Sequence, residues 1–272
     1  MRALPALLLS AALLPYAPSA QANAPGRWQL IFQDSFENAD RFLDLFEKNG
    51  RRWTHFQRTI ESNEIEVVSR GARRGTNALR LLAVPSGKTV SKADVERALP
   101  LLKEGDTLII QAWMFLPRGP SLEDVFLLDL ECGSCWPTFA LVSNKSPGIR
   151  IQLKGDVGYP LVERGKIGLS NYRHNGAGPI RPVPRGVWTR MRFYARLASN
   201  ETGLVRVEFD DRVVFSSNGP NLPDPRLFIR YGIFLKHTGY DRFQIGVTAN
   251  GSRNPVEMML DTVSVRLKRR PL

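Results

Sequence analysis

The sequence has no apolar run long enough to cross a bilayer as a helix, which needs about 20 residues. It has a shorter apolar stretch at its start, where Arg2 precedes Ala3–Leu14 and Ala20-Gln-Ala22 supplies small residues for cleavage. These three parts together make a secretory signal peptide. We therefore expect a signal peptide over residues 1–22 and a secreted or periplasmic mature protein, with no stable membrane insertion.

Cysteine and histidine are also scarce, with two and three residues among 272. A zinc site would need a second pair of ligands beside Cys132 and Cys135, and the sequence supplies none with suitable spacing. A thioredoxin-like redox pair would need a βαβ context, and no helical pattern follows these cysteines. In an oxidising compartment, Cys132 and Cys135 are expected to form a small structural disulfide.

Helical periodicity, internal repeats and low-complexity segments are nearly absent. A period of two dominates, and only residues 38–48 suggest a short helix. The sequence predicts one all-β domain over residues 23–272, a sandwich or a barrel, with residues 178–185 as a surface loop and Asp210-Asp211 as a hairpin turn. The expected strands are 28–32, 64–69, 78–84, 107–115, 125–131, 148–153, 188–197, 204–209, 212–216, 230–236, 244–247 and 256–267.

One of these strands, 188–196, alternates clearly between two faces. Its solvent-facing side would carry Trp188, Arg190, Arg192, Tyr194 and Arg196, and its buried side would carry the residues between them. Cations beside aromatic rings suit acidic sugars, but basic side chains also protect sheet edges from pairing with other chains. Both interpretations stay open from the sequence.

The formal net charge is +12, or +11 without residues 1–22, because Arg2 is the only charge in that segment. Such a surplus favours polyanionic partners. No nucleic-acid-binding motif is present and the basic residues are spread along the chain. An acidic polysaccharide is therefore the expected partner, engaged by a monomer, and nucleic acid is not expected.

Several segments resemble the jelly-roll polysaccharide lyases, especially the heparin lyase I-like and glucuronan lyase-like groups. The resemblance implies a concanavalin A-like jelly-roll β-sandwich of two antiparallel sheets, and β-elimination on a uronate-containing polysaccharide. The segments are Trp28-Gln-Leu-Ile-Phe-Gln-Asp-Ser-Phe36, Trp188-Thr-Arg-Met-Arg-Phe193, Tyr231-Gly-Ile-Phe-Leu-Lys-His-Thr-Gly-Tyr240 and Asp261-Thr-Val-Ser-Val265.

The same resemblance implies roles for individual residues, because β-elimination needs a group that neutralises the carboxylate, a base and an acid. Tyr240 would be the base or acid, Lys236 would hold charge, and Arg97 would lie in the cleft. The histidine of these families is replaced by Asp129 and Glu131, so His174 or His237 would substitute for it. Substrate binding is assigned to Lys236, Asp129, Glu131, Gln152, Tyr172 and Arg173.

The segment Leu127-Leu-Asp-Leu-Glu131 also resembles the catalytic strand of laminarinase-like glycoside hydrolases. Period two places residues 127, 129 and 131 on one face, and retaining hydrolysis needs two carboxyls there. Leu127 stands where the nucleophile is expected, which leaves Asp129 and Glu131. These acids could equally bind sugar hydroxyls or pair with arginines.

Three functions follow, in order of preference: a polysaccharide lyase-like enzyme, a non-catalytic carbohydrate-binding module, and a laminarinase-like hydrolase. None of them requires a cofactor. A structural calcium ion, common in jelly-roll carbohydrate proteins, would draw on Asp34, Glu37 and Asp261, but no compact oxygen-ligand motif is present and no metal is assigned.

Overall fold

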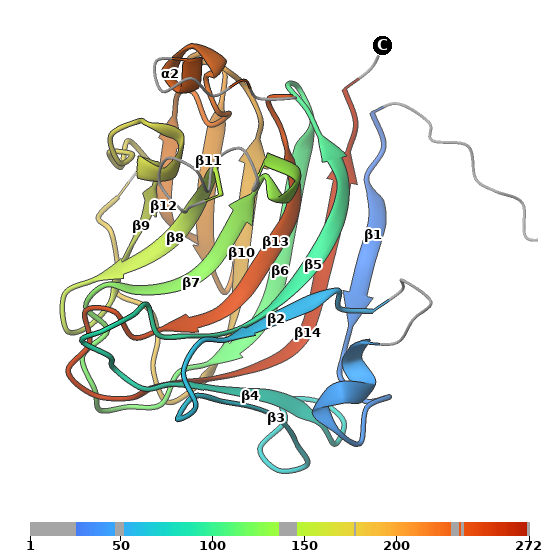
Figure 1. Ribbon diagram of the computed structural model, residues 1–272, viewed down its shortest axis with the longest axis vertical. Helices are drawn as coiled ribbons and strands as arrows, with labels where there is room; N and C mark the ends of the chain where they lie inside the picture. Colours follow the sequence, from blue (N-terminus) through green and yellow to red (C-terminus); the bar gives the residue numbers. More distant parts are fainter. Residues whose placement is uncertain are drawn as a thin grey trace, which may run out of the picture.

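Two antiparallel β-sheets packed face to face make up the molecule (Figure 1). The computed structural model describes residues 26–46, 52–135, 146–176, 178–229, 234 and 237–270. The arrangement is the jelly-roll sandwich predicted from the sequence. Helical structure in the described residues is limited to short turns, and none of these helices could span a bilayer. They are η1 (Phe42–Phe46), η2 (Gly133–Cys135), η3 (Gly165–Ile167) and α2 (Pro225–Ile229).

The larger sheet has eight strands in the order β12-β11-β10-β6-β14-β4-β3, with β1 also paired to β14. The long strand β14 therefore holds three neighbours, because β1 and β6 flank its second half and β4 its first. The strands are β1 (Gln29–Asp34), β3 (Glu64–Val68), β4 (Ala78–Ala83), β6 (Thr107–Phe115), β10 (Trp188–Arg196), β11 (Leu204–Phe209), β12 (Arg212–Asn218) and β14 (Val256–Lys268).

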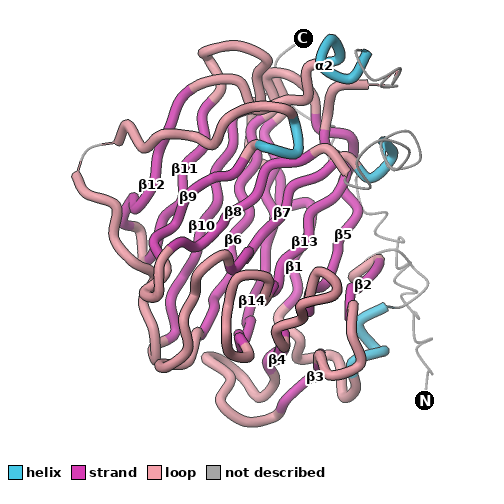
Figure 2. The backbone as a smooth tube through the Cα atoms, turned by 60° about the vertical axis from the view of Figure 1, so that its left-hand side comes forward, coloured by secondary structure: helices cyan, strands magenta, loops and turns pink. Residues whose placement is uncertain are grey.

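The smaller sheet has six strands in the order β2-β5-β13-β7-β8-β9. Figure 1 shows it in front of the larger sheet, and in the turned view of Figure 2 it lies to the right; β13 and β7 are its central strands. The strands are β2 (His55–Arg58), β5 (Lys92–Leu102), β7 (Val125–Glu131), β8 (Gly148–Lys154), β9 (Tyr159–Glu163) and β13 (Tyr240–Thr248).

Most of the expected strands are present, and β6, β7 and β11 have the predicted bounds. The hairpin at Asp210-Asp211 is confirmed, with φ of 48° and 64° at the two residues, as a tight two-residue turn requires. The predicted helix at 38–48 is the short η1 turn. The strands β2, β5 and β9 were not among the expected strands. Residues 1–22 lie outside the described part, as does all of the expected strand 230–236 except Phe234.

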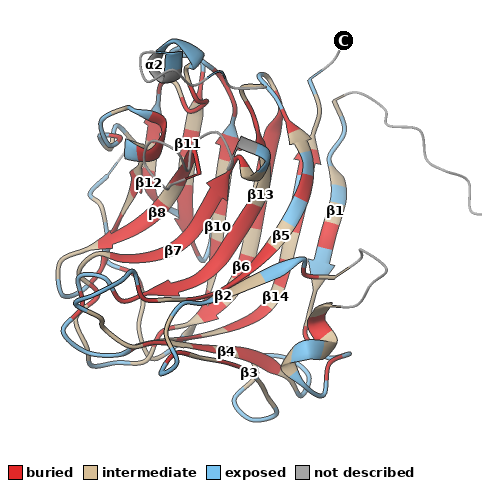
Figure 3. Cartoon of the chain, in the orientation of Figure 1, coloured by how far each residue is buried: buried red, intermediate tan, exposed pale blue. Residues whose placement is uncertain are grey.

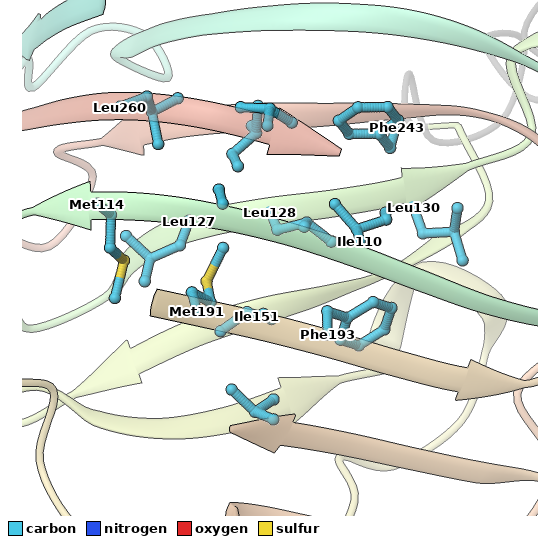
Figure 4. Packing of buried hydrophobic residues seen from close by; sticks show 14 of the residues in the cluster. Ile110, Met114, Leu127, Leu128, Leu130, Ile151, Met191, Phe193, Phe243 and Leu260 are labelled. Atoms are coloured by element: carbon cyan, nitrogen blue, oxygen red, sulfur yellow. The ribbon is translucent and has the colours of Figure 1, made fainter. Parts of the chain in front are cut away.

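Apolar side chains from both sheets fill the space between them, as Figure 4 shows for Met114, Met191, Phe193 and Phe243. Strand β10 alternates as expected, since its side chains from Thr189 to Ala195 are buried at every second position. Burial of side chains such as Phe193 removes enough apolar area to contribute roughly 2 kcal/mol each. The packed interior therefore fixes the smaller sheet in place and turns its other face outward.

Two β-bulges in the smaller sheet change which residues face outward. In β7 the register with β8 shifts between Phe126 and Leu128. In β13 the register with β5 shifts between Tyr240 and Arg242. A bulge inserts one extra residue and so reverses the inward and outward alternation beyond it. The two register shifts therefore decide which side chains reach the outer face of the smaller sheet.

Candidate functional site

The outer face of the smaller sheet carries polar side chains on four adjacent strands. Gln244 of β13 lies opposite Glu96 of β5 on one side and Asp129 of β7 on the other, and Asp129 lies opposite Arg150 of β8. Several of these residues are nearly fully buried although they face away from the core (Figure 3). We call this set the polar face: Lys92, Asp94, Glu96, Asp129, Glu131, Arg150, Gln152, Arg242 and Gln244.

Lys166, on the η3 turn, neutralises two carboxylates at the centre of the polar face. Its ammonium group bonds to Glu131 and lies 3.3 Å from Asp129 Oδ2. Lys166 is only 8% exposed, and the two acids 5% and 3%. A buried charge must be paired to be tolerated, so Lys166 is the counter-ion that allows Asp129 and Glu131 to lie side by side.

Arg242 and Gln244 hold the next pair of acids. The Arg242 guanidinium lies 2.7 Å from Glu131 Oε2 and 3.2 Å from Glu96 Oε2. The Gln244 side-chain amide donates to the same two oxygens, at 3.0 Å from Glu96 and 3.3 Å from Glu131. Glu96 and Glu131 therefore share one cation and one amide donor.

A small hollow separates Asp94 from Asp129. It has a volume of about 10 Å³, enough for one water molecule, and is lined in part by Lys92, Gln244 and Gly246. Gly246 packs against β5 so closely that a Cβ there would lie 2.5 Å from the Asp94 Cα. Oδ1 of Asp94 and Oδ1 of Asp129 are both buried without a hydrogen-bond partner.

Lys92 is the cation nearest this hollow. Its ammonium nitrogen lies 3.9 Å from Asp94 Oδ2, 3.7 Å from Asp129 Oδ2 and 3.3 Å from Gln244 Oε1. These contacts are longer than the charge-assisted bonds of Arg242. Lys92 can therefore turn toward an incoming carboxylate without breaking a short bond.

The pKa values of Asp94 and Asp129 are shifted in opposite directions. Burial and, to a smaller extent, the neighbouring carboxylates raise the pKa of Asp94 to about 7, against the attraction of Lys92. Burial would also raise the pKa of Asp129, but the charges of Lys166, Lys92 and Arg150 outweigh it and lower that pKa. Acid–base catalysis uses such a pair of carboxyl groups, in which Asp94 carries a proton and the neighbouring Asp129 is ionised.

Three predicted substrate-binding residues lie on the polar face. Asp129 and Glu131 belong to the ion-pair network, and the Gln152 amide donates to Asp124 Oδ1 at 2.6 Å. The residues that sequence reasoning missed are Lys92, Asp94, Glu96, Lys166, Arg150, Arg242 and Gln244. A signal for the β5 members was present, because Lys92, Asp94 and Glu96 alternate within one strand.

Tyr240 does not lie on the polar face, which corrects the role predicted for it. The bulge before Arg242 turns its side chain into the core, where it is 0% exposed. Its hydroxyl donates to the backbone carbonyl of Asn221 at 2.5 Å, and burial raises its pKa well above the ordinary value. A side chain in this position cannot contact a polymer.

Replacing Tyr240 with phenylalanine is therefore expected to leave polysaccharide binding or cleavage unchanged. The variant loses one buried hydrogen bond, so its free energy of unfolding should fall by about 1 kcal/mol. Chemical denaturation and a polymer-binding isotherm on the same preparation measure the two quantities. A large loss of binding or cleavage in a folded Tyr240→Phe protein would contradict the inward placement.

Arg97 is also placed away from the polar face. It follows Glu96 on β5 and lies opposite Phe243, a core residue, so its side chain points to the other side of the sheet. There its guanidinium lies 5.1 Å from the Phe32 ring and bonds to the Arg52 carbonyl. Glu96, not Arg97, is the residue of this pair that faces outward.

The two histidines expected near the cleft have different positions. His174 packs against Phe215 of the larger sheet; its Nδ1 accepts the Ser216 amide and its Nε2 lies 3.0 Å from the Gly178 carbonyl oxygen. These bonds explain His174 as a structural residue. His237 lies just beyond the end of β7, with Nε2 2.6 Å from Ser134 Oγ. Its catalytic role stays a prediction.

The remaining predicted residues contribute little to the polar face. Tyr172 is buried and its hydroxyl donates to the carbonyls of Gly219 and Pro220, so it supports a loop. Arg173 is exposed. Lys236 and the Cys135 side chain lie outside the described residues, so the charge role of Lys236 and the Cys132–Cys135 disulfide stay predictions.

The hydrolase interpretation loses its geometric basis at Leu127. The β7 bulge turns Leu127 and Leu128 together into the core (Figure 4), so residue 127 does not share a face with Asp129 and Glu131. Asp129 and Glu131 do share the polar face, but both are tied to Lys166. The cations around Asp129 also lower its pKa, so Asp129 is not in a position to carry a proton as the general acid that hydrolysis requires.

The acids named for calcium already have other partners. Asp34 accepts bonds from the Phe36 amide and the Trp53 ring, and Glu37 from the Thr76 and Asn77 amides. Asp261 accepts the Arg74 amide. Within the described ranges, one group of three potential ligands lies close together, Cys132, His237 and Asp241. Asp241 there binds the Gly133 and Ser134 amides, and we assign no metal to it.

Comparison with solved structures shows the same fold. The endo-β-1,4-glucuronan lyase of the fungus Trichoderma reesei superposes with a TM-score of 0.58 at 15% identity, over 78% of this chain and 90% of that one. The cellulose-induced protein Cip1 gives 0.57 at 12% identity, over 86% and 96%. No protein-family profile matches the sequence, and no curated protein matches it. The chain thus has the jelly-roll fold of polysaccharide lyase-like proteins.

Proposed function

We propose that this protein binds a uronate-containing polysaccharide on the polar face of the smaller sheet. The observation that carries the proposal is the hollow between Asp94 and Asp129, where two buried carboxylate oxygens lack partners beside the loosely held cation of Lys92. Sugar hydroxyls donate to such oxygens, and a uronate carboxylate accepts from an ammonium group.

The surrounding charges are consistent with an acidic ligand despite the number of carboxylates. Glu96, Glu131 and Asp129 already form ion pairs with Arg242, Lys166 or both. Asp94 bears a proton over much of the neutral range, because its pKa is about 7. The formal charge of +12 on the whole chain attracts a polyanion to the surface.

A second candidate function, cleavage by β-elimination, is favoured by the split between Asp94 and Asp129. A group with a pKa near the working pH can accept the C5 proton in one form and donate to the departing oxygen in the other. Asp94 would take that role, while Lys92 and Gln244 stabilise the charge that develops on the uronate carboxylate. The glucuronan lyase fold supports this candidate at the level of architecture.

Replacing Lys92 with methionine is the direct test of the polar face. The variant removes the cation nearest the hollow, so binding of polyglucuronate is expected to weaken about tenfold or more. Isothermal titration measures binding, and ultraviolet absorbance detects unsaturated uronate if the polymer is cleaved. The matched control is Lys88→Gln, which removes an exposed loop cation.

The outcomes separate the two candidates. Saturable binding with a rising absorbance supports β-elimination, and saturable binding with a flat trace supports a binding module. If Lys92→Met and Lys88→Gln bind polyglucuronate as the unmodified protein does, the polar face is not the binding site.

A further inference from the structure

The outer face of the larger sheet carries a second concentration of positive charge, on the sheet opposite the polar face. One cross-strand row runs from Arg266 through Ile109 and Tyr194 to Arg206. The next row contains Lys268 and, two strands away, Arg196. We call these six residues the basic surface.

The spacing of the basic surface follows from sheet geometry. Neighbouring strands lie about 4.8 Å apart, so Arg266 and Arg206 are separated by roughly 14 Å, with Ile109 and Tyr194 between them. The Arg206 guanidinium lies 5.7 Å from the Tyr194 ring. Cations therefore flank an aromatic and an aliphatic side chain on one flat patch.

These cations are poorly compensated compared with those of the polar face. Among the described residues, Arg196, Arg266 and Lys268 form no ion pair, and Arg206 has a single long one, 3.7 Å from Glu208. By contrast, Arg190 and Arg192 on the same face pair with Asp211, and Arg192 also with Glu208. The basic surface therefore carries more positive charge than its ion pairs balance.

Protection of a sheet edge does not account for this charge. The strands that carry it, β14, β10 and β11, each have partners on both sides, and the edge strands of the sheet are β12, β3 and β1. Interior strands expose no unpaired backbone groups, so they need no charged residues against edge pairing. Like charges gathered on one face of a sheet repel one another, and an anion bound between them would relieve that repulsion.

We propose that the basic surface is a second binding site for an acidic polysaccharide, separate from the polar face. Carboxylates of the polymer would pair with Arg206, Arg266 and Lys268, and the carbon-bound faces of its sugar rings would pack on Tyr194 and Ile109. A chain held there would keep the protein on the polymer while the polar face engages another stretch. This site does not depend on the polar face being functional.

The test uses two charge-matched triple variants of the full chain. The first is Arg206→Gln, Arg266→Gln and Lys268→Gln, and the control is Lys88→Gln, Arg181→Gln and Arg253→Gln, all exposed loop cations. Binding of polyglucuronate of defined length is measured at low and high salt. The first triple is expected to weaken binding about tenfold at low salt, and the control less than about twofold.

Tyr194→Ala adds a readout that net charge does not affect. It should weaken polyglucuronate binding while leaving binding of single-stranded DNA and phosphatidylglycerol vesicles unchanged. Equal affinities of the two triples would overturn the proposal, as would equal sensitivity of DNA or vesicles to Tyr194→Ala. Complete loss of polyglucuronate binding in Lys92→Met would also overturn the proposal. If Lys92→Met still binds polyglucuronate and the first triple removes that binding, the result supports the basic surface as a binding site, even if the polar face does not bind the polymer.

Discussion

Replacing Lys166 with methionine is expected to lower the free energy of unfolding by about 3–5 kcal/mol. Lys166 is buried and contacts both Asp129 and Glu131. Methionine fills similar space without charge, so two buried carboxylates lose their nearest common counter-ion. Lys92, Arg150 and Arg242 stay nearby and limit the loss, which urea denaturation of the folded chain measures directly.

A matched lysine at the surface provides the control for Lys166. Lys154 also pairs with two acids, Glu123 and Asp124, but its side chain is 40% exposed. Lys154→Met should therefore cost less than about 1 kcal/mol. Adding Asp129→Asn and Glu131→Gln to Lys166→Met should recover part of the stability, because the uncompensated charges are removed. If Lys166→Met and Lys154→Met are equally mild, the polar face is hydrated and Lys166 is not its central counter-ion.

Replacing Asp94 with asparagine should stabilise the protein at pH 8 and have little effect below pH 4. The pKa of Asp94 is about 7 in the folded protein, against an ordinary value of 3.8. The folded state thus holds this proton more tightly, so its contribution to stability is fully present below about pH 4 and lost as the pH rises through 7. Asparagine cannot ionise and avoids that loss, which amounts to at most about 4 kcal/mol.

Replacing Asp129 with asparagine is expected to have the opposite effect on the free energy of unfolding. The pKa of Asp129 is lowered, so its contribution is present above its ordinary pKa and lost as the pH falls. Asp129→Asn should therefore destabilise the protein at pH 8, and the deficit should shrink in acid. Denaturation curves of both variants at pH 5 and pH 8 test the pair. Loss of stability at pH 8 in Asp94→Asn would show that the ionised Asp94 carboxylate stabilises the folded protein, which contradicts a raised pKa.

The same Asp94 variant tests the β-elimination candidate. If Asp94 moves the proton, Asp94→Asn should lose about a hundredfold or more in cleavage rate while it still binds polyglucuronate. An inactive but more stable protein cannot be explained by misfolding. Unchanged cleavage would transfer the acid–base role to another residue, and His237 is the next candidate.

The fold was predictable from the sequence because alternation is visible wherever one face of a strand is apolar. Strands β6 and β11 alternate in this way, and both have the bounds that the sequence predicts. The short strand β2 lies at an edge, where few contacts constrain its sequence. Strand β5 was harder to interpret, because its outward acids Asp94 and Glu96 are themselves buried in the ion-pair network.

The site was less predictable because it depends on two bulges. Counting by twos from Gln244 places Tyr240 outward, and counting from Asp129 places Leu127 outward. Each count crosses a register shift that reverses the face. Nothing in the residues at either position marks the shift, because partner strands set it. Arg97, by contrast, could have been excluded from the alternation of Lys92, Asp94 and Glu96 alone.

The central position of β13 and β14 has a consequence for how the chain folds. These are the last two strands described, yet β13 lies between β5 and β7, and β14 joins β1, β4 and β6. Neither sheet can close until both strands have formed, and their contacts bridge most of the chain. Such distant pairings make folding slow. The nascent chain would therefore complete neither sheet until β13 and β14 have left the ribosome.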